Sequence, residues 1–268
     1  MLSIVMPAYN EAAILERSIR EWYEVIDKLE GAELLIVDDC STDDTASVLN
    51  SLSQTLPRLR ALQTPQNGGH GRAVLFGIQN ATKPFVFHTD SDRQHTPVDF
   101  WTLWELRDHY DFIFGVREQR ADGMFRLFVT RTMRLILFLF WGKWIRDANC
   151  PFKLMRTEAL RSVLSRVPSG SFIPMVMVAL LARTMGYRTT EVEIQHFNRK
   201  GGQQSLHGFI RWLRIGTRCV MELLTFRISL SDWSQPNAEE RAIASRPIAS
   251  SAVSHSDGTH THDISQQR

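Results

Sequence analysis

Apolar runs alternate with amphipathic stretches through the first half of the chain. Short apolar runs at residues 3–6, 34–37, 85–88 and 112–115 predict β-strands, and residues 59–63 are a further candidate strand. Helical spacing of apolar residues follows at 12–29 and 45–56, and a further helix is expected from the Gly-rich stretch at 67–71 to about residue 80. Strands that alternate with helices favour an α/β fold in which helices flank a mostly parallel sheet.

The second half of the chain is more helical. Residues 125–144 are apolar over much of a helical surface and carry several arginines, and residues 206–228 form an amphipathic helix. Residues 152–155 and 190–196 are expected to be strands. The apolar faces of the two helical segments could pack into the core or lie on a membrane surface, and the pattern alone does not decide between these.

The composition changes near Ser234, after which Ser, Ala, Thr, His and Asp dominate. A segment so poor in large apolar residues cannot bury enough surface to order itself. The sequence therefore predicts one domain over residues 1–230, with the amphipathic helix 206–228 at its end, and a disordered tail over residues 234–268.

Composition and length narrow the class of protein. The chain has 268 residues, 43% of them hydrophobic, and a net charge of +2, which are ordinary values for a globular protein with a sizeable core. The 3 cysteines form no CxxC pair, so neither a disulfide framework nor a zinc cluster is expected. We therefore expect the protein in a reducing compartment. No secretory signal is recognised and no apolar run reaches the about 20 residues that a membrane-spanning helix needs, so a cytoplasmic location is expected.

Polar clusters follow the predicted strands, at the sheet edge where α/β proteins bind ligands. "FHTDSDRQHTP" leaves the fourth strand on Asp90 and Asp92, whose carboxylates would point the same way in an extended chain. Paired carboxylates suit a hard divalent cation, Mg²⁺ or Mn²⁺, and Gln94 could add a neutral oxygen. The alternative is a solvated turn, since Asp and Ser are common turn residues.

Two further clusters have equally open interpretations. In "VDDCSTDD", Asp38 or Asp39 could accept hydrogen bonds from a nucleobase or ribose, while the residues from Ser41 onward cap the next helix. In "NGGHGRAVLFG", backbone N–H groups could cradle a phosphate, or the glycines could simply form a loop that enters a helix.

Arginines and a late polar loop complete the candidates. The basic run could bind phosphate groups or form a solvated helix face, and it consists of Arg117, Arg120, Arg126, Arg131 and Arg134. The polar loop "HFNRKGGQQSLHG" could be a lid or only a connector.

The order of these motifs is more specific than any one of them. "VMPAYNE", "IVDDCSTD", "NGGHGRA", "DSDRQHTP", "GVR" and "NRKGGQQS" together resemble the family 2 glycosyltransferases with the GT-A fold, and most of all the dolichol-phosphate mannosyltransferase type. The resemblance covers about residues 2–228. It implies a Mg²⁺- or Mn²⁺-dependent, inverting transfer of a sugar from a GDP- or UDP-sugar to a polyprenyl phosphate, such as dolichyl or undecaprenyl phosphate.

The resemblance also implies roles for individual residues. It places nucleotide-sugar contacts at Pro7, Tyr9, Glu11, Val37, Asp39, Asp90, Ser91, Asp92, Gln94, Arg117 and Arg199. It implies that Asp90, Asp92 and Gln94 hold the metal, and that Arg126 and Arg131 contact the acceptor phosphate. Within these sets, Asp92, Arg117 and Arg126 are the implied catalytic residues.

Two segments depart from the family pattern, and the first of them concerns the donor. The late loop commonly reads R-x-x-G-x-S-K, and here Ser205 occupies the Lys position, which leaves the identity of the donor open. Pro151 replaces a glycine in "RDANCPFKLMR".

The resemblance also implies where the enzyme would act and which partners it would have. The enzyme would attach peripherally at the cytoplasmic face of a membrane, or dock on a membrane partner protein, and would bind no nucleic acid. Transfer to a carbohydrate acceptor in cell-surface polysaccharide synthesis, or nucleotide-sugar binding without catalysis, are the alternatives.

Overall fold

The computed structural model describes residues 1–117, 124–168, 170–197, 209–229 and 242–244. Its centre is a 7-stranded sheet with the order β3-β2-β1-β4-β6-β5-β7. The strands are β1 (Leu2–Ala8), β2 (Glu33–Asp38), β3 (Leu59–Gln63), β4 (Phe85–His88), β5 (Phe112–Arg117), β6 (Lys153–Arg156) and β7 (Thr189–Ile194). Only β6 runs antiparallel to its neighbours, β4 and β5, so the predicted α/β fold with a mostly parallel sheet is confirmed.

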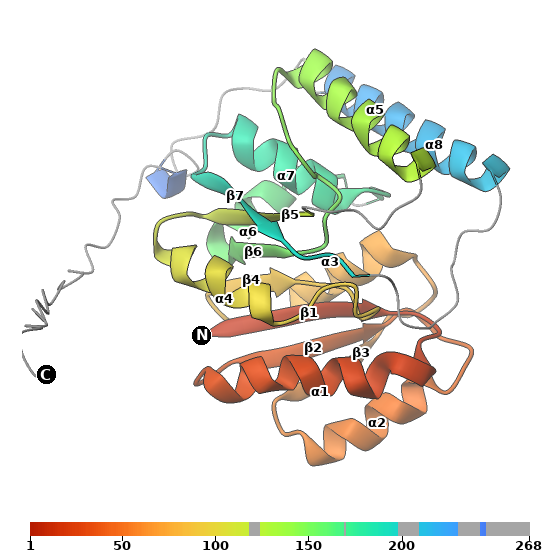
Figure 1. Ribbon diagram of the computed structural model, residues 1–268, viewed down its shortest axis with the longest axis vertical. Coiled ribbons are helices and arrows are strands. Elements are labelled where there is room, and N and C mark those ends of the chain that lie inside the picture. The colour runs from red at the N-terminus through yellow and green to blue at the C-terminus, as the bar shows by residue number, and fades with distance from the viewer. Residues whose placement is uncertain (118–123, 169, 198–208, 230–241, 245–268) are drawn as a thin grey trace, which may run out of the picture.

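Helices cover both faces of this sheet (Figure 1). One face packs against α1 (Ala12–Lys28), α2 (Thr45–Thr55) and α4 (Val98–Glu105), and a 3-10 helix, η1 (Leu106–Asp108), follows α4. The other face packs against α3 (His70–Asn80), α6 (Thr157–Leu164) and α7 (Pro174–Thr184). Strands covered on both sides have no solvent face, which explains why β1, β2 and β4 are buried along their whole length.

One glycine lets α3 approach the sheet closely. A Cβ atom built on Gly77 would lie 2.4 Å from Cγ1 of Val5 on β1 and 2.9 Å from Cγ2 of Val37 on β2. Real Cβ atoms do not tolerate such contacts without displacement of the helix or the strands. The position of α3, and with it the position of the residues at its first turn, therefore depends on Gly77.

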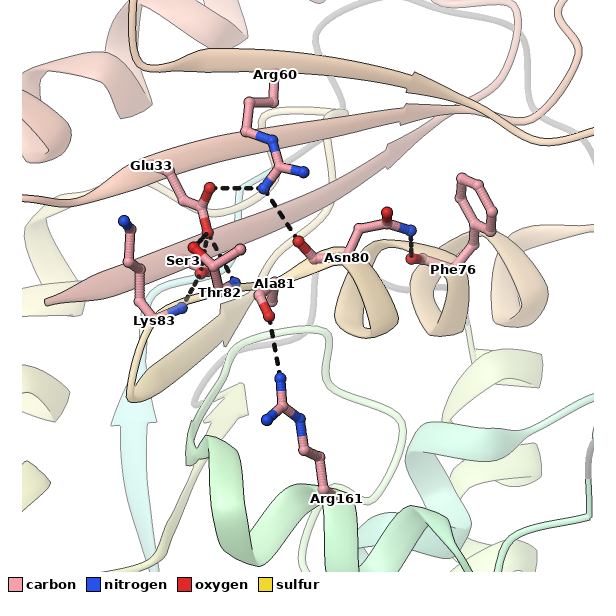
Figure 2. A network of polar contacts seen from close by, with 9 residues as sticks. All are labelled: Ser3, Glu33, Arg60, Phe76, Asn80, Ala81, Thr82, Lys83 and Arg161. Carbon is pink, nitrogen blue, oxygen red and sulfur yellow. Dashed lines mark hydrogen bonds and ion pairs between the residues drawn. The ribbon is translucent and has the colours of Figure 1, made fainter.

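A buried carboxylate holds the amino-terminal edge of the sheet together, as Figure 2 shows. Glu33 at the start of β2 accepts hydrogen bonds from Ser3 Oγ (2.6 Å), the Thr82 backbone N–H (2.9 Å) and Arg60 (2.8 Å). Arg60 also donates to the carbonyl of Asn80 at 3.0 Å. Burial alone would raise the pKa of Glu33, but these hydrogen bonds outweigh it and lower the pKa. The network joins β1, β2 and β3 to the end of α3.

The two arginine-containing helices of the second half lie side by side at the upper right of Figure 1 and contact each other. They are α5 (Met124–Trp141) and α8 (Phe209–Ser229). Leu223 and Phe226 of α8 are buried in the core, and the Glu222 carboxylate accepts hydrogen bonds from Ser171 Oγ (2.6 Å) and Phe172 N–H (3.0 Å). Of the two interpretations of this amphipathic helix, packing into the core therefore holds for the face that carries Leu223 and Phe226.

Neither helix could cross a membrane, and the same holds for every other helix in the described parts of the chain. Of the predicted tail, the structure describes residues 242–244, a helical turn whose Ile243 packs against the core. The remainder of the range 234–268 lies outside the described residues, and its disorder stays a prediction.

Candidate functional site

The carboxyl ends of β1, β2, β4, β5 and β7 meet at one edge of the sheet, because these strands share one direction. In Figure 1 this edge lies at the right, where β1 points. The non-glycine residues with positive φ in the described chain all lie here: Asn10 (53°), Cys40 (55°) and Arg93 (59°). Left-handed backbone costs about 1–2 kcal/mol per residue and is concentrated at functional sites, so this edge is the candidate site.

The loop after β1 is tied to the loop after β4. Ser91 Oγ lies 2.8 Å from the carbonyl oxygen of Pro7 and within hydrogen-bonding reach of the buried Glu11 carboxylate. The Glu11 backbone N–H donates to Thr45 Oγ1 at 3.0 Å, at the start of α2. Tyr9, between Pro7 and Glu11, is 43% exposed. The structure thus brings the "PAYNE" and "DSDRQ" motifs together, with Tyr9 exposed and Asn10 half-buried in the first motif.

Asp39 organises the glycine-rich loop that precedes α3. Its buried carboxylate accepts hydrogen bonds from Thr64 Oγ1 (2.8 Å), Gly68 N–H (3.0 Å) and Gly69 N–H (2.7 Å). The N–H groups of Gly68 and Gly69, which could have cradled a phosphate, are therefore satisfied by protein. Val37, the other predicted nucleotide contact of this motif, is fully buried in β2. Of the two interpretations of this loop, entry into a helix is the one that the hydrogen bonds favour.

Asp90 lies among histidines. Its Oδ1 atom is 2.8 Å from Nε2 of His70, the first residue of α3, and 3.8 Å from Nε2 of His88, the last residue of β4. Burial would raise the pKa of Asp90, but the charge of His70 and its hydrogen bond outweigh this and lower it below its usual range. Burial lowers the pKa of His88 to about 3, so its imidazole is neutral.

Asp92 and Gln94 shape the rest of this loop. Asp92 Oδ1 accepts a hydrogen bond from the Gln94 backbone N–H at 3.1 Å, which is the geometry of an Asx turn. The Gln94 carbonyl accepts from the Phe197 N–H at 2.9 Å, at the start of the late polar loop. Asp92 is not part of the cluster formed by Asp90, His70 and His88. Asp92 thus makes a turn contact, and this contact leaves the metal interpretation of Asp92 open.

Arg117, at the end of β5, is held by a carboxylate that the sequence reasoning missed. Its guanidinium makes a bidentate ion pair with Asp147, at 2.7 Å for Nε and 3.0 Å for the second nitrogen. Asp147 is 3% exposed. The segment "RDANCPFKLMR" could have indicated this partner, because Asp147 comes shortly before β6. Strand β6 begins at the sheet edge where β5 ends.

A buried lysine from the same segment lies beside this pair. Lys153 donates to the Ala148 carbonyl at 3.0 Å, and burial lowers the pKa of its amine to about 8. Sequence reasoning did not single out this residue either.

The remaining predicted residues lie on the second half of the chain. Arg131 is exposed on α5, and Arg126 belongs to the same helix, five positions earlier. The side chain of Arg126, and all of Arg199, lie outside the described residues. Their predicted contacts with phosphate stay predictions.

The fold matches that of sugar-transferring enzymes of known structure. Glucosyl-3-phosphoglycerate synthase from Mycobacterium tuberculosis, in complex with Mn²⁺, UDP-glucose and phosphoglyceric acid, superposes with a TM-score of 0.63 at 18% identity, over 89% of this chain and 81% of that one. A mannosyltransferase from Pyrobaculum calidifontis in complex with GDP-Man and Mn²⁺ gives 0.60 at 22% identity, over 88% and 65%. The fold class is therefore that of the GT-A glycosyltransferases, as predicted.

Sequence comparison gives the family. Residues 3–164 match the model of glycosyl transferase family 2, and the chain belongs to this family. It is 30% identical over 204 residues to an undecaprenyl-phosphate 4-deoxy-4-formamido-L-arabinose transferase of Sodalis glossinidius, covering 75% of this chain and 61% of that protein. The protein of the same description from Klebsiella pneumoniae is 27% identical over 232 residues, covering 85% and 69%. The chain thus spans less than two thirds of the first of these relatives.

Proposed function

We propose that this protein transfers a sugar from a nucleotide-sugar donor to a polyprenyl phosphate, with the help of a divalent cation. The observation that carries the proposal is the convergence of the "PAYNE", "VDD" and "DSDRQ" loops at one sheet edge in a member of glycosyl transferase family 2. The relatives described as undecaprenyl-phosphate transferases support a polyprenyl phosphate as acceptor. UDP-glucose and GDP-Man in the structurally similar proteins support a nucleotide-sugar donor.

The residues at the edge suit the implied cation. Asp90 presents a carboxylate whose low pKa keeps it ionised, and oxygen ligands of this kind are those that Mg²⁺ and Mn²⁺ prefer. Asp92 and Gln94 lie in the same short loop, and the predicted metal set of Asp90, Asp92 and Gln94 is retained as part of the proposal. When bound, the cation would neutralise charge on the donor diphosphate.

The chain's own residues would position the two substrates. Tyr9, exposed beside the buried Glu11, is available to the nucleotide, and Asp39 fixes the glycine-rich loop at the same sheet edge. Asp147 fixes Arg117 by two hydrogen bonds, so that its guanidinium is oriented before any substrate binds.

The reaction needs little acid–base chemistry. An oxygen of the acceptor phosphate attacks the anomeric carbon of the sugar, the bond from that carbon to the donor diphosphate breaks, and the nucleoside diphosphate leaves with the electron pair. The acceptor phosphate is already anionic near neutral pH, so it needs orientation and charge stabilisation more than a base. Arg126 and Arg131 on α5 are the proposed contacts for this phosphate.

An exposed apolar surface supports peripheral attachment to a membrane. Large apolar side chains at the end of α5 and just beyond it are 43–67% exposed: Leu135, Phe138, Leu139, Phe140 and Trp144. Arg131 and Lys143 lie next to this surface in the sequence, and a mixture of aromatic, aliphatic and basic residues is typical of interfacial segments. We propose that this surface brings the protein to the bilayer that holds its acceptor.

Transfer is tested with labelled donors. Radiolabelled UDP- and GDP-sugars are incubated with Mn²⁺ and a short polyprenyl phosphate, and the label in the organic phase is counted. The proposal predicts lipid-linked label that depends on the polyprenyl phosphate. Label on soluble sugars instead would favour a carbohydrate acceptor, and no transfer from any donor would favour a binding protein without catalysis.

A variant of the acidic loop sharpens the test. Asp92→Asn should reduce transfer by about a hundredfold or more, because a group that acts on the departing diphosphate contributes on the order of 3 kcal/mol. The melting temperature should remain near that of the wild type. Asp108→Asn, at a half-buried carboxylate that pairs with Arg107 in η1, is the matched control. Equal turnover of Asp92→Asn at saturating donor would remove Asp92 from the site.

A further inference from the structure

A buried histidine beside Asp90 has no role in the proposed transfer. His88 is 1% exposed, and neither of its ring nitrogens has a hydrogen-bond partner among the described residues. A buried polar group without a partner costs about 1–3 kcal/mol, and such a group in a native protein calls for an explanation. Oδ1 of Asp90 lies 3.8 Å from His88 Nε2.

A second histidine reaches the same carboxylate oxygen from another element. His70 begins α3, and its Nε2 atom is 2.8 Å from Asp90 Oδ1. The side chain of His70 is 57% exposed, so an ion could arrive from solvent on this side. The ligand atoms of His70, His88 and Asp90 all lie within 4.8 Å of one another.

This spacing fits a common cation. Metal bonds to imidazole nitrogen and carboxylate oxygen are about 2.1 Å long, which puts neighbouring ligand atoms about 3.0–3.5 Å apart and opposite ones about 4.2 Å apart. The separations of 2.8 Å and 3.8 Å fall close to that range.

We propose that His70 and His88 each add an imidazole nitrogen to the Asp90 carboxylate as ligands of the divalent cation that the acidic loop holds. The inference deepens the proposed function, since this ion would be the one that serves the donor diphosphate. The cation would then be the missing polar partner of the His88 imidazole. It would take the place of the hydrogen bond between His70 and Asp90.

The proposed ligand set has a consequence for metal preference. Imidazole suits transition metals, whereas Mg²⁺ favours carboxylate, carbonyl and water oxygens. The site should therefore bind Mn²⁺ and Co²⁺ more tightly than Mg²⁺, and His70 should be responsible for part of that difference.

Paramagnetic resonance tests the inference without sugar transfer. Purified protein is titrated with MnCl₂, with and without UDP, and electron spin-echo modulation from ¹⁴N is recorded on the bound ion. We expect nitrogen modulation in the wild type, weaker modulation in His70→Gln, and a loss of Mn²⁺ affinity of about tenfold or more with a smaller loss for Mg²⁺. His109→Gln, at an exposed histidine just after η1, should match the wild type.

The outcomes are distinct. Bound Mn²⁺ without nitrogen modulation, or equal Mn²⁺ affinity in His70→Gln, would refute the imidazole ligands and leave the proposed transfer intact. Nitrogen-ligated Mn²⁺ in a protein that transfers no sugar would support this inference and refute the proposed function. His88→Gln is a second variant, compared only if its melting temperature shows that it folds, and it should weaken Mn²⁺ binding in the same way.

Discussion

The buried ion pair between Arg117 and Asp147 offers a quantitative test of how the site is held. Replacement of Asp147 by asparagine preserves its shape but removes its charge and one of its two acceptor oxygens. The amide nitrogen would then face a guanidinium N–H, so that two donors meet in a site where Asp147 is 3% and Arg117 13% exposed. Breaking a buried ion pair by changing one partner costs about 3–5 kcal/mol.

The expected effect is large enough to measure by denaturation. A loss of about 3 kcal/mol should lower the melting temperature by about 6–12 °C in a domain of this size. Urea unfolding followed by circular dichroism gives the free energy of unfolding. Glu16→Gln is the control, because it removes only an exposed ion pair with Arg20 on α1. This variant should change the free energy of unfolding by less than about 1 kcal/mol.

A double-mutant cycle separates the pair from other effects. If the cost arises from a guanidinium left without its carboxylate, then Arg117→Met in the Asp147→Asn background should cost much less than Arg117→Met in the wild type. A coupling energy of about 2 kcal/mol or more is expected. Asp147→Asn with a stability within about 1 kcal/mol of the wild type, or additive single and double variants, would refute the reasoning.

The remaining predictions concern packing, pH and the membrane surface. Gly77→Ala should destabilise the protein by about 1–3 kcal/mol in thermal unfolding, because its Cβ would lie 2.4 Å from a strand side chain, whereas Gly216→Ala on α8 meets no atom within 4 Å and should be neutral or stabilising. The lowered pKa of Glu33 contributes stability that is present above its ordinary value of 4.5 and lost as the pH falls below it, so Glu33→Gln should be less stable at pH 7 and show a flatter pH dependence under acid. Leu139→Asp should reduce flotation with anionic liposomes, while Val98→Asp, at an equally exposed site on α4, should not; equal flotation of the two variants would contradict the membrane surface.

The first half of the fold was predictable because its signals are local. The strand predicted at residues 59–63 matches β3, and that at 85–88, a short apolar run, matches β4. The helices α4, α6 and α7 were not predicted. In α7 nine consecutive residues from Pro174 to Ala182 are buried, so no polar face reveals a helical period.

The site was predictable where it depends on short motifs, and less so where it depends on contacts between distant segments. "DSDRQ" indicated the loop that carries Asp90 and Asp92. The pairing of Arg117 with Asp147, and of Asp90 with His70, depends on residues 30 and 20 positions apart that meet only once the sheet has formed. Likewise, nothing in the sequence indicated that Asp39 takes up the N–H groups of the glycine-rich loop.

The central claim is that the acidic loop after β4 holds a cation together with a nucleotide diphosphate. The most direct measurement is anomalous diffraction from crystals grown with Mn²⁺ and UDP. The account predicts a manganese peak in contact with Asp90 and with the diphosphate, at the edge where β1, β2 and β4 end. Ordered UDP bound elsewhere, with the Asp90 carboxylate still paired to His70 and no manganese beside it, would contradict the account.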